Sequence, residues 1–557
     1  MTHPFVCIWH FVSQCAVNFA AHFNSQSQAR QLRQRWLPLV VVWLLASGGA
    51  QSELSVRRCD GSERNGVDPR SAAVACAEAA AKPPSARPNI VFILCDDLGY
   101  GDVGCFGQQK IRTPNIDRLA REGMRLTTHY SGNAVCAPSR CVLMTGKHPG
   151  HAFIRDNRQY RGNEEGQYPI PADLVTLPKI LQQLGYVNGA FGKWGLGAPA
   201  TSGEPLRQGI DRFFGYNCQA VAHNFYPPTL WDNATQIKLN NPAFAAHQKL
   251  PAGADPEKPE SYARYRGQDY APDRIAAEAL KFVRQHAERP FFLYYPTTVP
   301  HLALQVPEDS LQEYAGKFPE QPYVGNRGYL PNLTPRATYA AMITRLDREI
   351  GKLLGLLDEL KIADRTLVVF TSDNGPLYDE LGGTDTEFFG SAGGLRGRKG
   401  SLYEGGVRVP CVVRWPGRVA AGSTSDRVTG FEDWLPTLLE IGGESARIPA
   451  GLDGVSFAPT LLGKSQPPRE LLYREFPGYG GQQSIRMGDW KAIRQRLNPG
   501  PKQALKPGPV ELYNLRQDPA EERNVATEHP DLVARLQQQL NQQHERSELF
   551  PIRALDD

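Results

Sequence analysis

The chain has 557 residues, of which 41% are hydrophobic and 22% are charged, and its formal net charge is +4. This length and composition predict a globular protein with more than one hydrophobic core, so two domains are expected. Three of the excess positive charges lie before Ala50. The small charge that remains indicates neither a nucleic acid nor a membrane surface as a partner.

The first fifty residues have the pattern of an export signal. Arg30, Arg33 and Arg35 precede an apolar run over 36–46, and small residues over 47–50 supply a cleavage site. The apolar run is too short to cross a bilayer, which needs about 20 residues. We therefore expect a signal-peptide region over 1–50 and an exported, periplasmic or extracellular protein; the less favoured alternative is a membrane anchor.

Residues 51–87 are rich in Ser, Ala, Arg, Gly and Pro, which predicts a linker. The ten cysteines show no CxxC spacing, so neither a zinc site nor a dense disulfide framework is indicated. Cys59 and Cys76 lie in the linker and could pair. Five other cysteines are expected to be packing residues: Cys95, Cys105, Cys141, Cys218 and Cys411.

A continuous apolar run over 89–94 predicts a strand that is buried on both faces of a parallel sheet. Asp96 and Asp97 follow at its carboxyl end, which is where open α/β sheets bind ligands. Alternatively, the two carboxylates only cap the next turn. Thr113 and Pro114 then occupy the N-cap and first-turn positions of a helix that ends at Gly123.

The sequence from Cys136 to Arg140 places a small nucleophile just before a short helix. The first turn of a helix offers unpaired N–H groups and a positive dipole end, which together attract an anion. Arg140 adds a permanent cation. In isolation, the same residues fit a buried cysteine near a helix cap equally well.

A helix closed by Gly185 is expected over 177–184, and a short strand over 186–191 leads into Lys193. The segment 215–233 has a loop-like, proline-containing sequence with scattered aromatic side chains. Aromatic rings with hydrogen-bonding groups suit the wall of a sugar site, although ordinary loop packing is an equal alternative. The candidate wall residues are His223, Tyr226 and Trp231.

Asp273 is expected to cap a helix that runs to about His286, and 291–295 predicts another buried strand. His301 lies just past the carboxyl end of that strand. A long amphipathic helix follows, because the apolar residues between Tyr339 and Leu357 keep helical spacing.

Asp373 and Asn374 follow a further apolar strand over 367–370, and they complement Asp96 and Asp97 at the same edge of the sheet. Three carboxylates and an amide make a hard-oxygen site of the kind that calcium or magnesium takes. Without a cation, the three carboxylates would repel one another. The sequence therefore predicts a metal site.

After Lys399, a strand is expected over 409–415 and a helix over 434–441. From residue 467 the pattern changes to short alternating segments and then to a polar helix from about Pro530, which predicts an antiparallel sheet with a helix packed on it. The expected domains are therefore 88–466, an α/β domain with a mixed, mostly parallel sheet between helices, and 467–557, a smaller α+β subdomain.

Several motifs resemble those of the sulfatase family. The run that contains Cys136 resembles the first signature of that family: two small or aliphatic residues, Cys, a small residue, Pro, Ser, Arg, two free positions, two large apolar residues, Thr and Gly. The run from Gly185 to Leu196 is similar to the second signature, and 395–410 resembles the Gly-Lys-Gly and Tyr-Glu-Gly-Gly stretch. The tail with Asp518, Pro519 and Asn524 is also similar.

This resemblance implies an alkaline-phosphatase-like fold and a type I, arylsulfatase-like sulfuric ester hydrolase. It implies that a separate formylglycine-generating enzyme converts Cys136 to 3-oxoalanine (formylglycine), whose hydrate is the nucleophile, and that one calcium ion is bound. The implied metal ligands are Asp96, Asp97, residue 136, Asp373 and Asn374. The implied catalytic set is Cys136, Arg140, Lys193, His301 and Lys399.

The chain departs from the second signature at Gly195, where the family usually has a histidine. His151 is a candidate replacement. A sulfated carbohydrate is the expected substrate, with an aryl sulfate as the generic one. Two alternatives stay open: a phosphodiester or phosphonate monoester hydrolase of the same superfamily, and an inactive glycan-binding homologue, which the loss of the histidine at 195 would favour.

Overall fold

The computed structural model describes residues 87–160, 165–500 and 502–557, and every structural statement below concerns these ranges. The expected signal-peptide region, nearly all of the expected linker, and Cys59 and Cys76 lie outside the described residues. All described residues belong to one compact unit.

The unit is built around a ten-stranded mixed sheet. In spatial order its strands are β11 (Ser423–Ser425), β2 (Met124–Leu126), β10 (Cys411–Arg414), β9 (Thr366–Ser372), β1 (Asn89–Asp96), β8 (Phe291–Pro300), β4 (Val187–Lys193), β5 (Arg212–Tyr216), β6 (Thr229–Asp232) and β7 (Thr235–Lys238). The five strands from β9 to β5 run parallel, while β10, β6 and β7 pair antiparallel with their neighbours. A small second sheet pairs β3 (His129–Tyr130) with β12 (Thr429–Gly430).

The central strand β1 shows why the sheet is covered on both faces. Its residues alternate between two hydrophobic cores, with Val91 and Ile93 in one and Phe92 and Leu94 in the other. All eight residues of β1 are buried. A strand that is buried on both faces reads as a continuous apolar run, so the expected parallel strand is confirmed.

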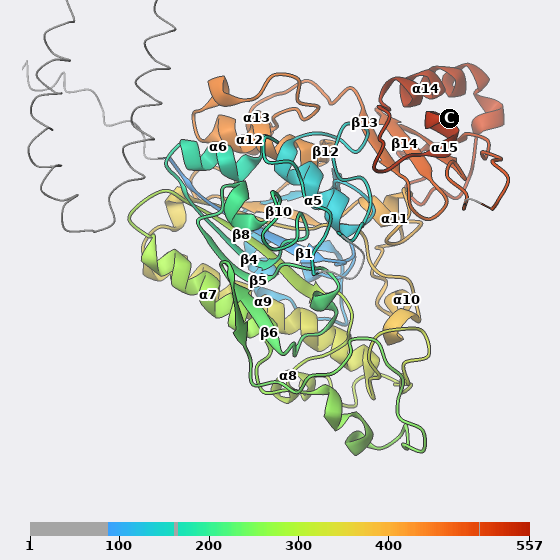
Figure 1. Cartoon of the computed structure of the whole chain (residues 1–557). Coiled ribbons are helices and arrows are strands. Elements are labelled where there is room, and N and C mark those ends of the chain that lie inside the picture. The colour runs from blue at the N-terminus through green and yellow to red at the C-terminus, as the bar shows by residue number, and fades with distance from the viewer. Residues whose placement is uncertain (1–86, 161–164, 501) are drawn as a thin grey trace, which may run out of the picture. The chain divides into compact units, whose positions relative to one another are not determined.

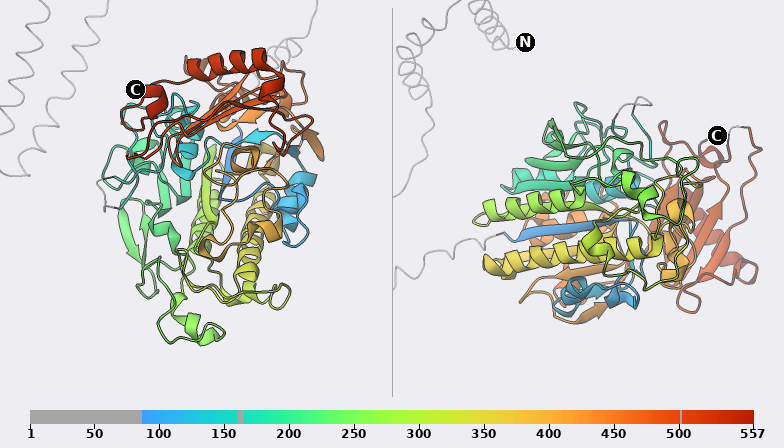
Figure 2. Two further views of the ribbon diagram at one scale, coloured as in Figure 1. Left: turned by 90° about the vertical axis from the view of Figure 1, so that its right-hand side faces the viewer. Right: turned by 90° about the horizontal axis from the view of Figure 1, so that it is seen from below.

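Helices cover both faces of the large sheet, as Figures 1 and 2 show. Against one face pack α4 (Pro114–Arg121), α7 (Ala271–Gln285) and α9 (Pro335–Glu359). Against the other pack α5 (Cys136–Thr145), α6 (Leu177–Gln183) and α12 (Trp434–Ile441). Short helices in the connections are α8 (Glu308–Leu311), α10 (Thr386–Phe389), α11 (Glu404–Val407) and α13 (Ala458–Leu461). The expected α/β fold, with a mixed sheet between helices, is confirmed.

Two local expectations are wrong. The N-cap of α7 is Tyr270, and Asp273 lies inside the first turn, where its carboxylate binds the guanidinium of Arg345 at 2.7 Å instead of capping the helix. The segment 215–233 is only partly a loop, because β5 ends at Tyr216 and β6 begins at Thr229. Trp231 therefore lies on a strand, opposite Gly215.

The C-terminal part forms the expected antiparallel sheet and helix. Its strands, in order, are β13 (Leu472–Phe476), β14 (Gln482–Met487), β15 (Trp490–Gln495) and β16 (Glu511–Asn514). The helix α14 (Pro530–Gln542) packs on this sheet through Leu536 and Leu540, and α15 (Arg553–Asp556) ends the chain. Figure 1 shows this part, in orange and red, beside α11. A boundary at 466/467 stays a prediction.

Buried ion pairs join the C-terminal sheet to the rest of the unit. Lys491 of β15 binds Glu404 of α11 at 2.9 Å, and Arg474 of β13 binds Glu432 at 2.9 Å. Within the C-terminal part, Lys491 also binds Glu521 at 3.0 Å. Removing one partner of a buried pair leaves an uncompensated charge, so these contacts make the two parts depend on each other.

The cysteines expected to be packing residues are free thiols that are buried, with Cys105 partly buried. None of the helices in the described ranges combines the length and the apolarity that a bilayer crossing requires.

Candidate active site

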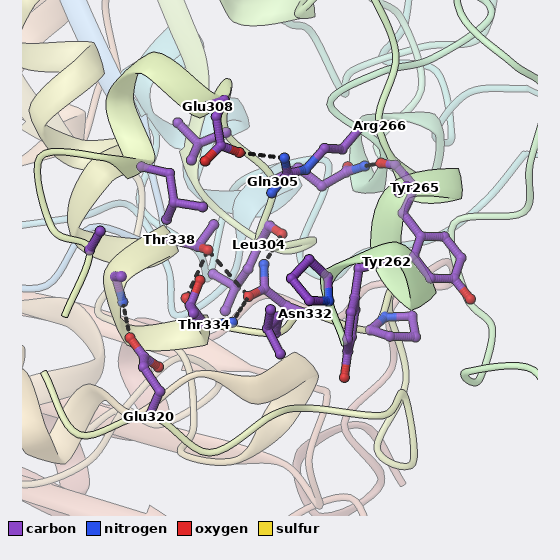
Figure 3. A pocket seen from close by; sticks show the side chains of 18 of the residues that line it. Tyr262, Tyr265, Arg266, Leu304, Gln305, Glu308, Glu320, Asn332, Thr334 and Thr338 are labelled. Atoms are coloured by element: carbon purple, nitrogen blue, oxygen red, sulfur yellow. Dashed lines mark hydrogen bonds and ion pairs between the residues drawn. The ribbon is translucent and has the colours of Figure 1, made fainter. Parts of the chain in front are cut away.

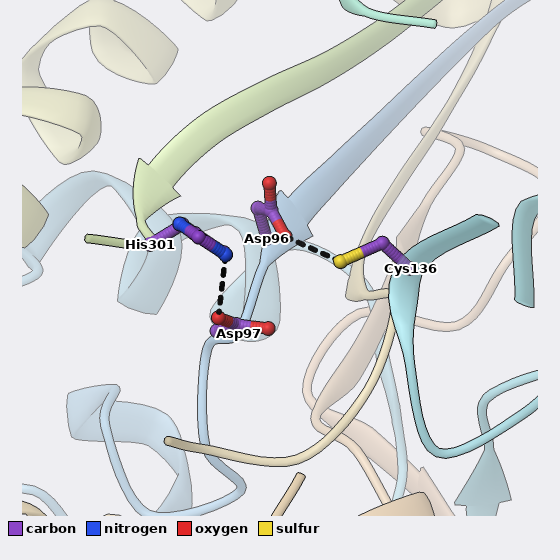
Figure 4. Close-up of side chains that lie close together, drawn as sticks. All are labelled: Asp96, Asp97, Cys136 and His301. Atoms are coloured by element: carbon purple, nitrogen blue, oxygen red, sulfur yellow. Dashed lines mark hydrogen bonds and ion pairs between the residues drawn. The ribbon is translucent and has the colours of Figure 1, made fainter. Parts of the chain in front are cut away.

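The carboxyl ends of four neighbouring parallel strands bring the site together. Asp96 ends β1 and Asp97 follows it, Lys193 ends β4, Asp373 follows β9 and His301 follows β8. Cys136 comes from a helix and not from a strand end, since it is the first residue of α5. Figure 4 shows the thiol of Cys136 pointing at Asp96, and the imidazole of His301 pointing at Asp97.

Cys136 is the first residue of α5, and it follows an extended N-cap residue, Val135. No N-cap side chain binds the first turn. Instead, Asn157 accepts a hydrogen bond from the backbone N–H of Ala137 at 3.0 Å through its Oδ1. The helix ends at Gly146, which has a φ of 68° and can take this left-handed conformation because it lacks a Cβ. Cys136 is thus held at the positive end of a short buried helix.

Two lysines and one carboxylate surround the Cys136 Sγ atom. Lys193 Nζ and Lys399 Nζ both lie 3.5 Å from the sulfur, and Asp96 Oδ1 lies 3.3 Å from it. Lys193 also binds Asp96 Oδ2 at 2.6 Å, and Lys399 binds Asp97 Oδ2 at 2.8 Å. Lys399, which is 263 residues from Cys136 in the sequence, therefore contacts its sulfur atom.

Arg140 lies one turn along α5 and is completely buried. Its Nη2 and Nε bind Asp373 Oδ2 at 2.7 and 3.1 Å, and Nη2 lies 3.7 Å from Asp96 Oδ2. Its Nη1 donates to the carbonyl of Lys193. The guanidinium thus ties α5 to the ends of β1, β4 and β9, a planar geometry that a lysine could not reproduce.

Asn374 completes the group at the end of β9. Its Nδ2 donates to Asp97 Oδ1 at 2.7 Å, and the backbone N–H of Asp97 donates to Asp373 Oδ1 at 3.2 Å. Asn374 Oδ1 is buried and has no hydrogen-bond partner among the described residues. A buried amide oxygen without a partner costs about 1–3 kcal/mol, so a ligand that bound to this atom would remove an unfavourable contribution.

The charges of the group shift its acidities in opposite directions. Burial opposes ionisation of Asp96, but Lys193, His301 and Arg140 together hold its pKa below the usual range. Burial, reinforced by the negative charge of Asp96, raises the pKa of Asp373 to about 6. Burial and Asp96 also raise the pKa of the Cys136 thiol to about 12, so an unmodified Cys136 is neutral at neutral pH.

His301 is oriented by the backbone. Its Nδ1 lies 2.7 Å from the carbonyl of Leu302, which can only accept a hydrogen bond, so Nδ1 carries a proton. Its Nε2 is left facing Asp97 Oδ2 at 3.4 Å. Burial and the charges of Lys399 and Lys193 lower the pKa of His301 well below its ordinary value.

Two aromatic rings, those of His223 and Tyr329, pack against His301. The sequence did not reveal these residues as a group. His223 lies parallel to His301 with ring centroids 5.0 Å apart, and Tyr329 packs edge-on against both rings. His247 accepts from the backbone N–H of Tyr329 at 3.0 Å and lies 3.1 Å from His223 Nδ1. His247 and Tyr329 sit in irregular segments with no motif around them, so no sequence signal marked them.

The other expected substrate residues lie elsewhere. His151 Nδ1 binds Asp453 Oδ1 at 2.9 Å, and its ring stacks on His148, so His151 does not replace the missing histidine at the Cys136 group. Trp231 is half-buried, and its indole N–H donates to Glu165 at 2.7 Å. Of the predicted sugar wall, the structure brings only His223 to the site.

Tyr226 is buried and borders a different cavity of about 550 Å³, shown in Figure 3. Its lining includes Tyr262, Tyr265 and Asn332, and Arg266 there binds Glu308. None of the side chains around Cys136 lines this cavity. The expectation that Tyr226, His223 and Trp231 form one wall is therefore wrong, because strand pairing and core packing separate the three.

A mostly parallel sheet whose strand ends bring three carboxylates and a lysine beside a buried cysteine, with a second lysine and an arginine, has the charges of a hydrolase for anionic esters. The sequence model of the sulfatase family matches residues 88–444, and a model described as the C-terminal part of N-sulphoglucosamine sulphohydrolase matches residues 398–546. The chain belongs to the sulfatase family, and it is an enzyme of the sulfuric ester hydrolase class.

Curated relatives match over most of their length. Arylsulfatase A of Homo sapiens is 33% identical over 494 residues, which cover 84% of this chain and 89% of the relative. The N-acetylgalactosamine-6-O-sulfatase of Bacteroides thetaiotaomicron is 30% identical over 509 residues, covering 82% and 93%.

Solved structures share the fold. The crystal structure of Ps i-CgsB in complex with k-i-k-neocarrahexaose has a TM-score of 0.66 and 27% identity, and it covers 82% of this chain and 92% of that one. The phosphonate monoester hydrolase of Agrobacterium radiobacter is similar in fold alone, with a TM-score of 0.55 and 22% identity over 84% of this chain and 99% of that one.

Proposed function

We propose that this protein is an exported, calcium-dependent sulfatase that hydrolyses sulfate esters of carbohydrates through a formylglycine formed from Cys136. The observation that carries the proposal is the position of Cys136, whose Sγ lies within 3.5 Å of two lysines and an aspartate in a buried group. A small anion that reached this position would meet two ammonium groups.

The residues around Asp97 fit a calcium ion. Asp96, Asp97 and Asp373 offer carboxylate oxygens, and Asn374 offers a buried carbonyl oxygen that has no other partner among the described residues. Calcium takes oxygen ligands of this kind. When bound, the ion would supply positive charge that polarises the sulfate oxygens and favours the ionised form of the nucleophile.

Formylglycine at 136 would supply a hydroxyl nucleophile that the neutral thiol does not offer. Around it, Lys193 and Lys399 hold the transferred sulfate, because each ammonium nitrogen lies 3.5 Å from Cys136 Sγ and therefore next to the place where the nucleophile would stand. Arg140 keeps Asp373 and Asp96 in place for the metal. His301 presents Nε2 to the site. Because Nδ1 holds the single proton of the neutral ring, Nε2 first takes up a proton and then passes it to the leaving oxygen.

Two observations support a carbohydrate as the alcohol part of the ester. Curated relatives include an N-acetylgalactosamine-6-O-sulfatase, and a similar structure holds a neocarrahexaose. In addition, two of the four exposed large apolar or aromatic side chains in the described ranges are tyrosines, Tyr378 and Tyr479, whose rings can pack on the face of a sugar. The ring of Tyr479 packs against Gly400, which directly follows Lys399.

Export and maturation follow from the same proposal. A sulfated polymer is met outside the cytoplasm, which agrees with the signal-peptide region expected over 1–50, the linker expected over 51–87 and the expectation of no stable membrane anchor. A formylglycine-generating enzyme is required during maturation. The catalytic domain is assigned to 88–466 and the C-terminal subdomain to 467–557, which contributes Tyr479.

The test is to produce the protein with and without a formylglycine-generating enzyme and to measure the mass of the peptide that contains residue 136. Converted protein with calcium should release sulfate from a sulfated glycan, whereas Cys136→Ala should release none. Phosphodiester and phosphonate monoester substrates are measured on the same preparation. Turnover of these esters that exceeds sulfate release by orders of magnitude, or full conversion without sulfate release from any glycan, would overturn the proposal.

A further inference from the structure

Gly195 lies two residues after Lys193 and has a φ of 80°, in the left-handed region that favours glycine. The space beside it is filled from another segment. A Cβ at position 195 would lie 3.4 Å from Cγ and 3.5 Å from Cδ of Gln219. The side chain of Gln219 therefore occupies the place toward which a side chain at 195 would project.

The amide of Gln219 is held in one orientation. Its Nε2 donates to Asn157 Oδ1 at 3.1 Å, and the same oxygen accepts from the backbone N–H of Ala137 at 3.0 Å. Because the N–H of Ala137 can only donate, the Asn157 atom must be the oxygen, and the Gln219 atom facing it must be the nitrogen. Gln219 is thereby linked to the residue next to Cys136.

The opposite atom of this amide, Gln219 Oε1, has no partner among the described residues, although the residue is only 5% exposed. An unpaired buried acceptor costs about 1–3 kcal/mol and needs an explanation. The amide lies between Gly195, at the end of β4, and the first turn of α5. These two elements carry Lys193 and Cys136, whose side chains meet at 3.5 Å.

We propose that Gln219 Oε1 accepts a hydrogen bond from a hydroxyl of the hydrated formylglycine at residue 136. This inference rests on the proposed function and adds a residue to it. A carboxamide has no proton to gain or lose at neutral pH, so Gln219 holds the hydrate and orients it but does not act as its base. His151 cannot take this part, because its ring is bound to Asp453 and stacked on His148.

The test compares Gln219→Met with a matched control, Gln208→Met. Methionine keeps the length of the side chain and removes the acceptor. Gln208 is also fully buried, its Oε1 also lacks a partner in the described part of the chain, and its Nε2 donates to the carbonyl of Ser202 at 2.7 Å. The two variants therefore lose similar groups from similar surroundings, and only Gln219 adjoins the Cys136 group.

The main readout is the rate at which methoxyamine forms an oxime at residue 136, followed by peptide mass. Methoxyamine reacts with the aldehyde and not with its hydrate, so loss of a contact that favours the hydrate should speed labelling several-fold in Gln219→Met. Sulfate release should fall at least ten-fold. Gln208→Met should match the parent in both measurements. Its melting temperature should fall by about as much as that of Gln219→Met.

This inference would be overturned, and the proposed function would stand, if converted Gln219→Met formed the oxime and released sulfate at the same rates as the parent. Equal changes in both variants would also overturn it, because they would reflect a general loss of packing. A parent protein that keeps Cys136 unmodified after production with a formylglycine-generating enzyme would overturn the proposed function, and the inference with it.

Discussion

Asn374 donates its amide to Asp97 Oδ1 at 2.7 Å and leaves its own Oδ1 buried without a partner among the described residues. The contact orients the amide so that its oxygen, and not its nitrogen, is free. One side chain thus positions a carboxylate and offers a further oxygen beside it. This arrangement fits a cation that prefers oxygen ligands.

The first prediction concerns this amide. Asn374→Leu should weaken calcium binding at least ten-fold, or about 1.4 kcal/mol, because it removes one oxygen ligand and releases Asp97. Calorimetric titration of calcium into chelator-treated protein measures the change. Asn188→Leu is the control, since Asn188 is equally buried, has an unpartnered Oδ1 in the described structure, and donates instead to the carbonyls of Pro178 and Gly209. An unchanged affinity in Asn374→Leu would remove Asn374 from the metal site.

The second prediction concerns Lys193. Lys193→Met should destabilise the calcium-free protein by about 3–5 kcal/mol, because Asp96 loses the ammonium that lies 2.6 Å away. Calcium should restore part of this stability by giving Asp96 a new cationic partner. Thermal unfolding with and without calcium measures both effects.

Lys491→Met is the matched control for Lys193→Met. Lys491 is also buried and paired with two carboxylates, those of Glu404 and Glu521, but it lies away from the Cys136 group. Its loss should not be relieved by calcium. If calcium stabilised both variants to the same extent, the ion would not be bound at Asp96.

The third prediction concerns Tyr479, which is 69% exposed. Tyr479→Ala should lower kcat/KM for a sulfated oligosaccharide by roughly five- to thirty-fold, because the variant loses about 1–2 kcal/mol of ring contact with a sugar. An aryl sulfate, which uses only the sulfate-binding residues, should be turned over as before. Equal losses on both substrates would show that Tyr479 shapes the Cys136 group and does not bind the sugar.

The fourth prediction concerns Trp231. Its indole is bound to Glu165 and packed against a hydrophobic core. Trp231→Ala should therefore lower the melting temperature and leave the ratio of glycan to aryl sulfate turnover unchanged. A selective loss of glycan turnover would return Trp231 to the substrate wall that the sequence suggested.

The fifth prediction concerns pH. Burial raises the pKa of Asp347 from 3.8 to about 6, although its carboxylate accepts hydrogen bonds from the first turn of α4. The folded state therefore holds a proton there between about pH 4 and 6 that the unfolded state has lost. Stability must then fall as the pH rises through this range, by about 3 kcal/mol for a shift of two units.

Asp347→Asn mimics the protonated carboxyl and should flatten this fall. Urea unfolding at pH 4, 5 and 6 provides the comparison. Asp364→Asn, which changes an exposed carboxylate, should keep the slope of the parent. If the free energy of unfolding of Asp347→Asn fell with pH as steeply as that of the parent, the pH dependence would come from other groups.

The sequence alone determined the fold class and grouped the side chains that lie around Cys136. The buried strand β1 reads as a continuous apolar run because both of its faces are covered, and the ends of parallel strands must meet at one edge of the sheet. Asp96, Asp97, Asp373 and Asn374 could therefore be grouped from local patterns. The motif around Cys136 could be recognised from the sequence because its residues are contiguous, and the role of nucleophile that it implies for residue 136 stays a prediction.

The tertiary structure decided which isolated side chains join that group. His247, Tyr329 and Gln219 lie in irregular segments without periodicity, so only the folded chain brings them beside His301 and Gly195. The same reason explains the errors: His151 and Trp231 have suitable side chains, but their backbones place them against Asp453 and Glu165. Sequence patterns report local conformation and burial, whereas contacts between distant loops depend on how packed helices and strands position the chain between them.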